Sequence, residues 1–373
     1  MELVRKNVSL VVTQSCNLSC VYCYEEYKTK KVMEFEKAFS IVEGYLSSPS
    51  KEYDECVIDF FGGEPFVNFN LIKQVCEAVW SRSWEKPYLF HTTTNGTLVH
   101  GEIKEWLSKN KDRFSVSVSL DGTPYMHNLN RSDSFSKIDV PFFQTTWENP
   151  STKMTVSKET LPYLAEGVIF LHSLGFTVNN NLAYGIDWSD IQNIEILSRE
   201  LGKLIIYYLE HPEITPCGLL DMKIEYQQYE EKKWCGTGTH MVVHDVNGES
   251  YPCQMFLPLS IGQEKASASQ RIDFTVSENL VDPKCKNCLI HPVCPTCYGS
   301  NYSESGDIAI RNNQQCQIMK VRALAVSYLK SKRILGRNKL ENLEGIDYLT
   351  VKAALEIQRK IKIDASQFVN HST

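Results

Sequence analysis

Three cysteines near the start of the chain constrain its fold and chemistry more than any other feature. They are Cys16, Cys20 and Cys23, at Cys-x3-Cys-x2-Cys spacing. The residues just before them, 8–13, are rich in β-branched side chains and predict a buried strand, so the cysteines lie on the loop that follows it. Soft thiolates packed on one loop suit an iron–sulfur cluster or zinc. Three of them leave one iron of a four-iron cluster open to a small molecule. A zinc knuckle and unrelated core cysteines are the alternatives.

The composition is that of an ordinary enzyme. The 373 residues are 42% hydrophobic and 23% charged, with a formal net charge of −6. This charge argues against nucleic acid as a partner. No apolar run reaches the length of a membrane span and no signal peptide opens the chain, so we expect a cytoplasmic protein without membrane attachment. In that reducing compartment the thirteen cysteines should not form disulfides.

Strand and helix patterns alternate through the first 210 residues. The alternation predicts βαβ units and a parallel sheet or barrel. Six units are counted, fewer than a closed eight-unit barrel needs. Residues 132–149 are less regular, and we expect a loop over the mouth of the barrel there. The expected strands are 8–13, 56–61, 88–94, 114–120, 152–156 and 176–183, and the expected helices are 33–46, 70–80, 103–109, 161–174 and 191–210.

The composition changes near residue 217, beyond which cysteines crowd into a loop-rich region. A hairpin is expected at 241–251, with its turn at Asn247-Gly248-Glu249. The rest of this region lacks apolar periodicity, so we expect it to need metal to fold. Helices are expected at 317–332 and within 342–363, before a polar tail. The predicted domains are 1–220 (partial barrel), 221–325 (cysteine-rich domain) and 326–373 (C-terminal helices and tail).

Several conspicuous loops follow predicted strands. Ligands of parallel sheets bind at the C-terminal ends of the strands. Gly62 and Gly63 allow a close backbone approach, and Glu64 can accept hydrogen bonds from an ammonium group. Taken singly, Gly-Gly-Glu-Pro and the later Asp121-Gly122 could each be a plain turn. Three other cysteines carry no assigned function. Cys56 and Cys76 fit buried small hydrophobic residues, and Cys217 has no obvious role.

The cysteine loop resembles that of the radical S-adenosylmethionine (SAM) superfamily. The resemblance implies a 4Fe–4S cluster on Cys16, Cys20 and Cys23 whose fourth iron is chelated by SAM. It places the SAM amine at the Gly62-Gly63-Glu64-Pro65 stretch. It also places Tyr22 beside the adenine, and it assigns contacts with the SAM carboxylate or ribose to Asn95, Ser119 and Arg131.

Seven later cysteines resemble the C-terminal SPASM domain of radical SAM maturases. Four of them, Cys285-x2-Cys288-x5-Cys294-x2-Cys297, would alone fit one zinc ion, but this leaves three unexplained. Two spacings depart from the SPASM pattern by one residue: Gly248 to Cys253, and Cys294 to Cys297. The resemblance implies two auxiliary 4Fe–4S clusters, three in all. The outer cluster is assigned to Cys285, Cys288, Cys294 and Cys316, and the inner cluster to Cys235, Cys253 and Cys297.

The inner cluster has only three cysteine ligands in this assignment. Anaerobic sulfatase-maturating enzymes, which the chain resembles in length and layout, supply a fourth cysteine shortly after the first. Here residues 236–240 contain none. Either His240 fills the site or the site stays open for a substrate thiolate.

The resemblance implies a 5′-deoxyadenosyl radical and an oxidative reaction on a peptide. We expect maturation of a ribosomally made peptide (RiPP), with a cysteine-derived thioether cross-link. The alternative is formylglycine formation on a sulfatase. The general base of that family follows the inner-cluster cysteine, and an amide, Gln254, stands there instead.

A different class, a non-catalytic electron carrier or zinc scaffold, would need neither Gly-Gly-Glu-Pro nor a ligand-short cluster. The implied partners are a peptide substrate and an electron donor such as flavodoxin or ferredoxin. Few residues precede the first strand. No leader-binding domain is therefore expected there. Either a separate protein binds the leader, or the barrel mouth and residues 132–149 do.

Overall fold

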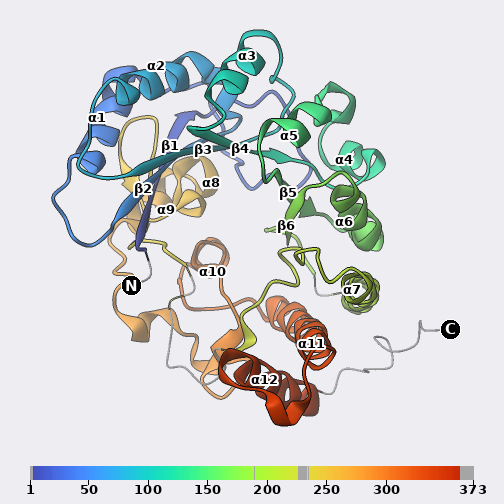
Figure 1. The fold of residues 1–373 in the computed structure, drawn as a ribbon. Helices are drawn as coiled ribbons and strands as arrows, with labels where there is room; N and C mark the ends of the chain where they lie inside the picture. The colour runs from blue at the N-terminus through green and yellow to red at the C-terminus, as the bar shows by residue number, and fades with distance from the viewer. Residues whose placement is uncertain (1–2, 189, 226–232, 234, 362–373) are drawn as a thin grey trace.

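A single sheet organises the computed structural model, which describes residues 3–188, 190–225, 233 and 235–361 (Figure 1). Within these residues the strand order is β6-β5-β4-β3-β2-β1-β7-β8. All neighbouring pairs are parallel except β7 with β8. The described strands form an open sheet with β6 and β8 at its edges. The expected partial six-unit barrel is confirmed. The strands are β1 (Arg5–Thr13), β2 (Glu55–Gly62), β3 (Tyr88–Thr94), β4 (Phe114–Ser119), β5 (Ser151–Val156), β6 (Thr177–Leu182), β7 (Met241–His244) and β8 (Ser250–Tyr251).

Helices connect the parallel strands and cover one face of the sheet (Figure 1). Apolar spacing explains them: in α1 the buried residues Ala38, Val42 and Leu46 stand four apart, on one face. The helices predicted in the first 210 residues are confirmed to within a few residues. The predicted polar tail, 364–373, lies outside the described residues. The helices are α1 (Phe35–Leu46), α2 (Phe69–Trp80), α3 (Gly101–Asn110), α4 (Pro124–Asn130), α5 (Val140–Thr146), α6 (Leu164–Ser173), α7 (Ile191–Glu210), α8 (Pro258–Ile261), α9 (Gln263–Ser269), α10 (Tyr298–Ser305), α11 (Asn313–Leu335) and α12 (Gly345–Lys360).

The expectation of an irregular loop at 132–149 is wrong, because α5 lies in it. The Asp139 carboxylate caps this helix by accepting the Phe142 N–H at 3.2 Å, and Pro141 stands in the first turn. Phe142 and Phe143 are buried, so the helix belongs to the core. With only seven residues, α5 is too short to show a clear helical period in the sequence.

The two faces of the sheet differ in polarity. On the face under the helices, Leu10, Ile58 and Phe60 are fully buried, and the Phe60 ring stacks on Phe90 and Phe114 at 5.6 and 6.0 Å. Each such side chain contributes about 1.5–3 kcal/mol of burial free energy. The opposite, inner face includes a polar row, Ser9, Asp59 and His91, across β1, β2 and β3. The sheet therefore packs its helices through one face and leaves the other for polar contacts.

The chain beyond residue 220 contacts the six-stranded unit, β1 to β6, at both of its edges. At one edge β7 pairs with β1, and the expected hairpin to β8 is confirmed. At the other edge α11 packs against α7, and the Arg322 guanidinium donates to the carbonyls of Gly218 and Leu219 at 3.2 and 3.1 Å. The sheet thus continues beyond residue 220, and the predicted domain boundaries stay predictions. In the described part of the chain no helix has the length and apolarity needed to cross a membrane.

Candidate functional site

Gly62 and Gly63 bring the end of β2 against the cysteine loop. The Gly63 and Glu64 N–H groups donate to the carbonyls of Thr13 and Ser15 at 3.2 and 2.9 Å. A Cβ on Gly62 would lie 2.0 Å from the Thr13 oxygen, and one on Gly63 would lie 2.5 Å from the Ser15 oxygen. Any other residue would push the two segments apart. The glycines therefore fix the position of the loop that carries the three cysteines.

The three N-terminal cysteines form one electrostatically coupled group. Burial raises the pKa of Cys20 to about 11; Arg131 lowers this pKa, and Asp121, Cys23 and Cys16 raise it further. The Lys28 ammonium donates to the Cys23 sulfur at 2.7 Å. Three coupled thiols with a lysine donor fit an electron-rich iron–sulfur cluster. Among the described residues, no three His, Cys, Asp or Glu side chains already stand in the arrangement of a metal shell.

The Glu64 carboxylate links the ends of three segments. It is 1% exposed and accepts hydrogen bonds from the Asn95 N–H at 2.7 Å, the Thr94 hydroxyl at 2.7 Å and the Phe66 N–H at 3.2 Å. Burial raises the pKa of Glu64, while these hydrogen bonds lower it. Its Oε2 atom has one partner, Asn95, in the described structure and retains capacity for a further donor.

Asn95 and Ser119 lie at the ends of neighbouring strands. The Asn95 amide donates to Asn17 Oδ1 of the cysteine loop at 2.8 Å, and its own oxygen accepts from Thr97. Asn95 therefore holds the loop as well as lying beside it. Ser119 closes β4 and is 7% exposed.

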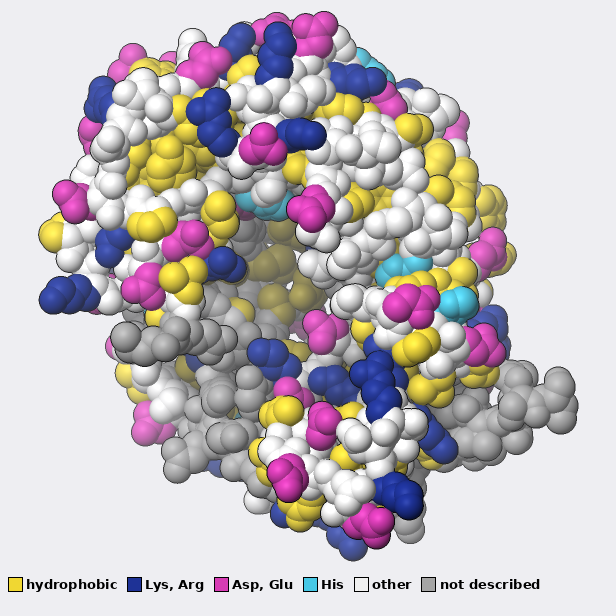
Figure 2. All heavy atoms as spheres, viewed as in Figure 1, with side chains coloured by type: hydrophobic (Ala, Val, Ile, Leu, Met, Phe, Trp, Pro, Cys, Tyr) yellow, Lys and Arg dark blue, Asp and Glu magenta, His cyan; other side chains and the backbone are white. Residues whose placement is uncertain are grey.

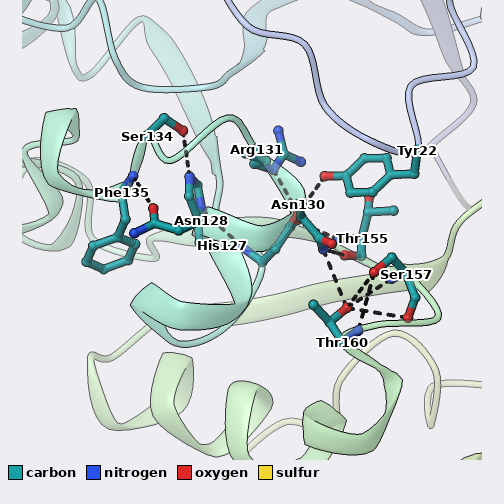
Figure 3. A network of polar contacts seen from close by, with 11 residues as sticks. Tyr22, His127, Asn128, Asn130, Arg131, Ser134, Phe135, Thr155, Ser157 and Thr160 are labelled. Carbon is teal, nitrogen blue, oxygen red and sulfur yellow. Dashed lines mark hydrogen bonds and ion pairs between the residues drawn. The ribbon is translucent and has the colours of Figure 1, made fainter.

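Asp121 is the centre of a buried network that sequence reasoning missed. Its partners Tyr22, Arg131 and Asn130 are labelled in Figure 3. Its Oδ2 accepts from Tyr22 Oη at 2.5 Å, Arg131 Nε at 2.9 Å and Asn130 Nδ2 at 3.1 Å. Its Oδ1 accepts the Thr155 N–H at 2.9 Å. The signal in the sequence was an Asp-Gly pair directly after a predicted strand, which is also a common turn.

This network brings together two of the predicted SAM-binding residues. The Arg131 guanidinium lies 5.5 Å from the centre of the Tyr22 ring. Burial would lower the pKa of Arg131, but Asp121, Tyr22 and Cys20 raise it, so the side chain is cationic. Only its Nε atom is hydrogen-bonded among the described residues, which leaves both terminal nitrogens for a ligand (Figure 3).

The seven later cysteines fall into two coupled groups. Burial raises the pKa of Cys253 to about 12, and Cys297 and Cys235 raise it further. Burial also raises the pKa of Cys294; Arg311, whose Nη1 lies 2.7 Å from the Cys294 sulfur, lowers it. Cys288, Cys285 and Cys316 complete this second group. The two groups contain the same cysteines as the inner and outer sets implied by the resemblance, although ligation itself stays a prediction. All thirteen cysteines are free.

The inner group lies close to the first cysteine group. Burial raises the pKa of Tyr24, and the carboxylate and thiolates of Glu25, Cys253 and Cys23 add to this effect. Tyr24 is therefore near enough to a thiol of each group, Cys23 and Cys253, to feel its charge. His240 is exposed and lines a surface pocket together with Cys235. Its ligation stays a prediction.

Comparisons with known proteins relate the chain to iron–sulfur proteins and to maturating enzymes. Residues 5–137 match a family described as a 4Fe-4S single cluster domain. An uncharacterized protein of Methanocaldococcus jannaschii is 30% identical over 184 residues, which cover 46% of this chain and 59% of the relative. A cysteine-type anaerobic sulfatase-maturating enzyme of Clostridium perfringens is 30% identical over 141 residues, which cover 34% and 37%. The alignments thus span less than two thirds of these relatives.

Two solved structures share the fold. Native anSMEcpe with bound AdoMet has a TM-score of 0.68 at 19% identity, covering 89% of this chain and 99% of that one. Streptococcus suis SuiB bound to the precursor peptide SuiA has a TM-score of 0.54 at 15% identity, covering 83% and 75%. At these identities the likeness establishes the fold alone.

The structure is an open parallel sheet with a cysteine loop after its first strand, which is the arrangement of a partial barrel. Residues 5–137 match a 4Fe-4S cluster family, and the relatives that match parts of the chain include a radical SAM cyclopropyl synthase and anaerobic sulfatase-maturating enzymes. The matched family is described by a 4Fe-4S cluster and the neighbour anSMEcpe binds AdoMet. The three N-terminal thiols and the free end of the Arg131 guanidinium fit these two groups.

Proposed function

We propose that this protein is a radical SAM enzyme that oxidatively modifies a cysteine-containing peptide. One observation carries the proposal: the Cys16–Cys23 loop, Glu64 and Arg131 converge at the C-terminal ends of β1, β2 and β4. When bound there, the cluster and SAM would supply hydrogen-atom abstraction by a 5′-deoxyadenosyl radical. Three clusters, on the three cysteine groups, are part of the proposal.

In this proposal Arg131, Glu64 and Tyr22 each bind a different group of SAM. The free end of Arg131 would pair with the SAM carboxylate, and Oε2 of Glu64 would accept from its ammonium. Tyr22, held by Asp121 at 2.5 Å, would present its ring to the adenine. Asn95 would act mainly by holding the cysteine loop through Asn17. The binding groups are thus fixed before SAM arrives, which lowers the entropic cost of binding.

The first test removes the three thiols. Replacing Cys16, Cys20 and Cys23 together by Ala should abolish 5′-deoxyadenosine formation with dithionite and lower the iron content by one cluster. Cys76→Ala, a buried cysteine of α2, is the matched control and should leave both unchanged. Undiminished SAM cleavage in the triple variant would refute the assignment of the SAM site.

For the substrate we favour a thioether cross-link made on a ribosomal peptide. The support is the inner group, which holds three cysteines near Tyr24 and so leaves a coordination position for a substrate thiolate. A peptide substrate is supported by Streptococcus suis SuiB, which shares the fold and has been solved bound to its precursor peptide SuiA. Formylglycine formation is the second candidate, supported by the sulfatase-maturating relatives. An electron donor such as flavodoxin or ferredoxin and a separate leader-binding protein complete the proposal.

A spectroscopic experiment tests the open inner site. In the triple variant, which lacks the SAM cluster's signal, a synthetic peptide containing one cysteine should perturb the auxiliary-cluster spectrum. The same peptide with serine should not, because a thiolate binds iron strongly and a hydroxyl does not. Equal spectra with both peptides would argue against substrate ligation and would leave thioether chemistry unsupported.

A further inference from the structure

The inner face of the sheet carries a partly buried carboxylate, Asp59, that the SAM site does not use. Ser9, Asp59 and His91 occupy one row across β1, β2 and β3, since Ser9 pairs with Asp59 and Asp59 with His91. Their neighbours Leu10 and Phe60 point to the opposite, helix-covered face. Figure 2 shows the molecule hollowed at its centre, in the region that Figure 1 places between the sheet and α10–α11. The polar row therefore belongs to the inner wall of the half-barrel.

Few interactions stabilise the negative charge of the Asp59 carboxylate. Its Oδ2 accepts one hydrogen bond, from Ser9 Oγ at 3.1 Å, and Oδ1 has no partner among the described residues. No cation of the described chain pairs with it. Burial raises the pKa of Asp59 to about 7, against one lowering hydrogen bond from Ser9. Yet the side chain is not fully covered, which is expected of a group enclosed by the barrel but facing its hollow. A carboxylate left in this state is costly for folding and is typical of functional sites.

Ser9 and Gln254 fix the direction of this hydrogen bond. Gln254 Nε2 donates to Ser9 Oγ at 2.9 Å, so the Ser9 hydroxyl proton is turned toward Asp59. Gln254 begins the short 3₁₀ turn Gln254–Phe256, directly after Cys253 of the inner group. The main-chain carbonyl of Gln254 is itself held by the Ser260 hydroxyl at 2.9 Å. Asp59 is therefore connected, through two hydrogen bonds, to the backbone that carries the inner cysteines.

The other titratable groups on this wall do not neutralise Asp59. On β3, burial lowers the pKa of His91, whose Nδ1 is bonded to Ser115 Oγ at 2.9 Å. On β5, burial lowers the pKa of Lys153, which makes no ion pair among the described residues. The elements on either side, β1 and the 254–256 turn, contribute only Ser9 and Gln254. A proton donor for the free Oδ1 must therefore come from a bound molecule or from water.

We propose that Asp59 is a proton acceptor for the peptide residue bound in the half-barrel. The group that it meets is a thiol or hydroxyl of that residue. In the step, the S–H or O–H bond breaks, the electron pair stays on sulfur or oxygen, and the proton goes to Oδ1 of Asp59. No electron is exchanged. This proposal rests on the proposed function, because it needs a peptide substrate in the hollow.

The test follows the protonation of Asp59 directly, by infrared difference spectra of the carboxyl group in the anaerobic, cluster-loaded protein. The band assigned to Asp59 is the one that Asp59→Asn removes and Asp59→Glu retains in shifted form. Asp139→Asn, the same change at a part-exposed aspartate, should leave it in place. We expect a titration midpoint near 7. A midpoint at the ordinary aspartate value of about 4 would overturn the proposal.

The probe for substrate contact is the tripeptide N-acetyl-Gly-Cys-Gly-amide, with the Gly-Ala-Gly analogue as blank. A thiol that donates to Oδ1 favours the ionised carboxylate, so the cysteine peptide should lower the midpoint by about half a unit or more. The blank should not. An unchanged midpoint, or an equal shift with both peptides, would refute the contact.

A separate measurement distinguishes this proposal from the proposed function. The Asp59→Asn protein should still cleave SAM to 5′-deoxyadenosine with dithionite, without peptide, within a few-fold of the parent. Loss of that activity in the variant alone would mean that Asp59 supports the SAM site instead, which contradicts the proposal. Absence of SAM cleavage in the parent would refute the proposed function, whatever the titration shows.

Discussion

Asp121→Asn tests whether one buried carboxylate holds the SAM-binding residues in place. Asp121 is fully buried and accepts four hydrogen bonds, among them Nε of Arg131, which is itself 7% exposed. Asparagine keeps the shape but turns an NH₂ group toward one of these donors and leaves the guanidinium buried without a counter-charge. Breaking a buried pair in this way costs about 3–5 kcal/mol. This is a large share of the roughly 5–15 kcal/mol that stabilises a typical domain.

The assay is urea unfolding under anaerobic conditions, followed by tryptophan fluorescence, together with SAM titration by calorimetry. Asp139→Asn is the control, because the Lys104–Asp139 pair is part-exposed and asparagine can still cap α5. The Asp139→Asn change should lower the free energy of unfolding by less than about 1 kcal/mol. The double variant Asp121→Asn/Arg131→Met removes both charges, and should be more stable than Asp121→Asn alone. A loss below about 1 kcal/mol in Asp121→Asn, or strictly additive losses in the double variant, would refute the reasoning.

Three further predictions concern Glu64, His240 and Asp59. Glu64→Gln should weaken SAM binding by about 1.5–3 kcal/mol, roughly 10- to 100-fold in Kd, because the charge is lost and an NH₂ group meets the Asn95 N–H; an unchanged calorimetric Kd would leave Glu64 a purely structural residue. His240→Ala should leave the auxiliary-cluster spectrum unchanged, and a changed spectrum without peptide would make His240 the fourth ligand. Asp59→Asn should raise the free energy of unfolding above pH 7 by up to about 4 kcal/mol, since a pKa raised from 3.8 to about 7 makes ionisation costly in the folded state. That gain should vanish below about pH 4, where Asp59 is protonated in both states, and a gain equal at both pH values would contradict the cause.

The sequence predicted what short-range patterns determine. Cys16, Cys20 and Cys23 must share a loop because only three and two residues separate them, whatever the rest of the chain does. The alternation of strand and helix patterns likewise predicted a parallel sheet with its loops at one edge, and the observed strand order confirms it. The short helix α5 was missed because two turns give too few apolar positions for a period to show.

The tertiary structure decided which distant residues meet. Nothing in the local sequence around Asp121 distinguishes a turn aspartate from one that accepts bonds from Tyr22 and Arg131. The same is true of Ser9 and Gln254, which are 245 residues apart and hydrogen-bonded. From the sequence alone, Gln254 indicated only that the residue after Cys253 is not the general base of the sulfatase-maturating enzymes. The register of β1 with β2 then placed Asp59 beside Ser9. Register and long-range packing follow from burying Leu10 and Phe60 beneath the helices, which turns every second side chain, Ser9 and Asp59 included, toward the hollow.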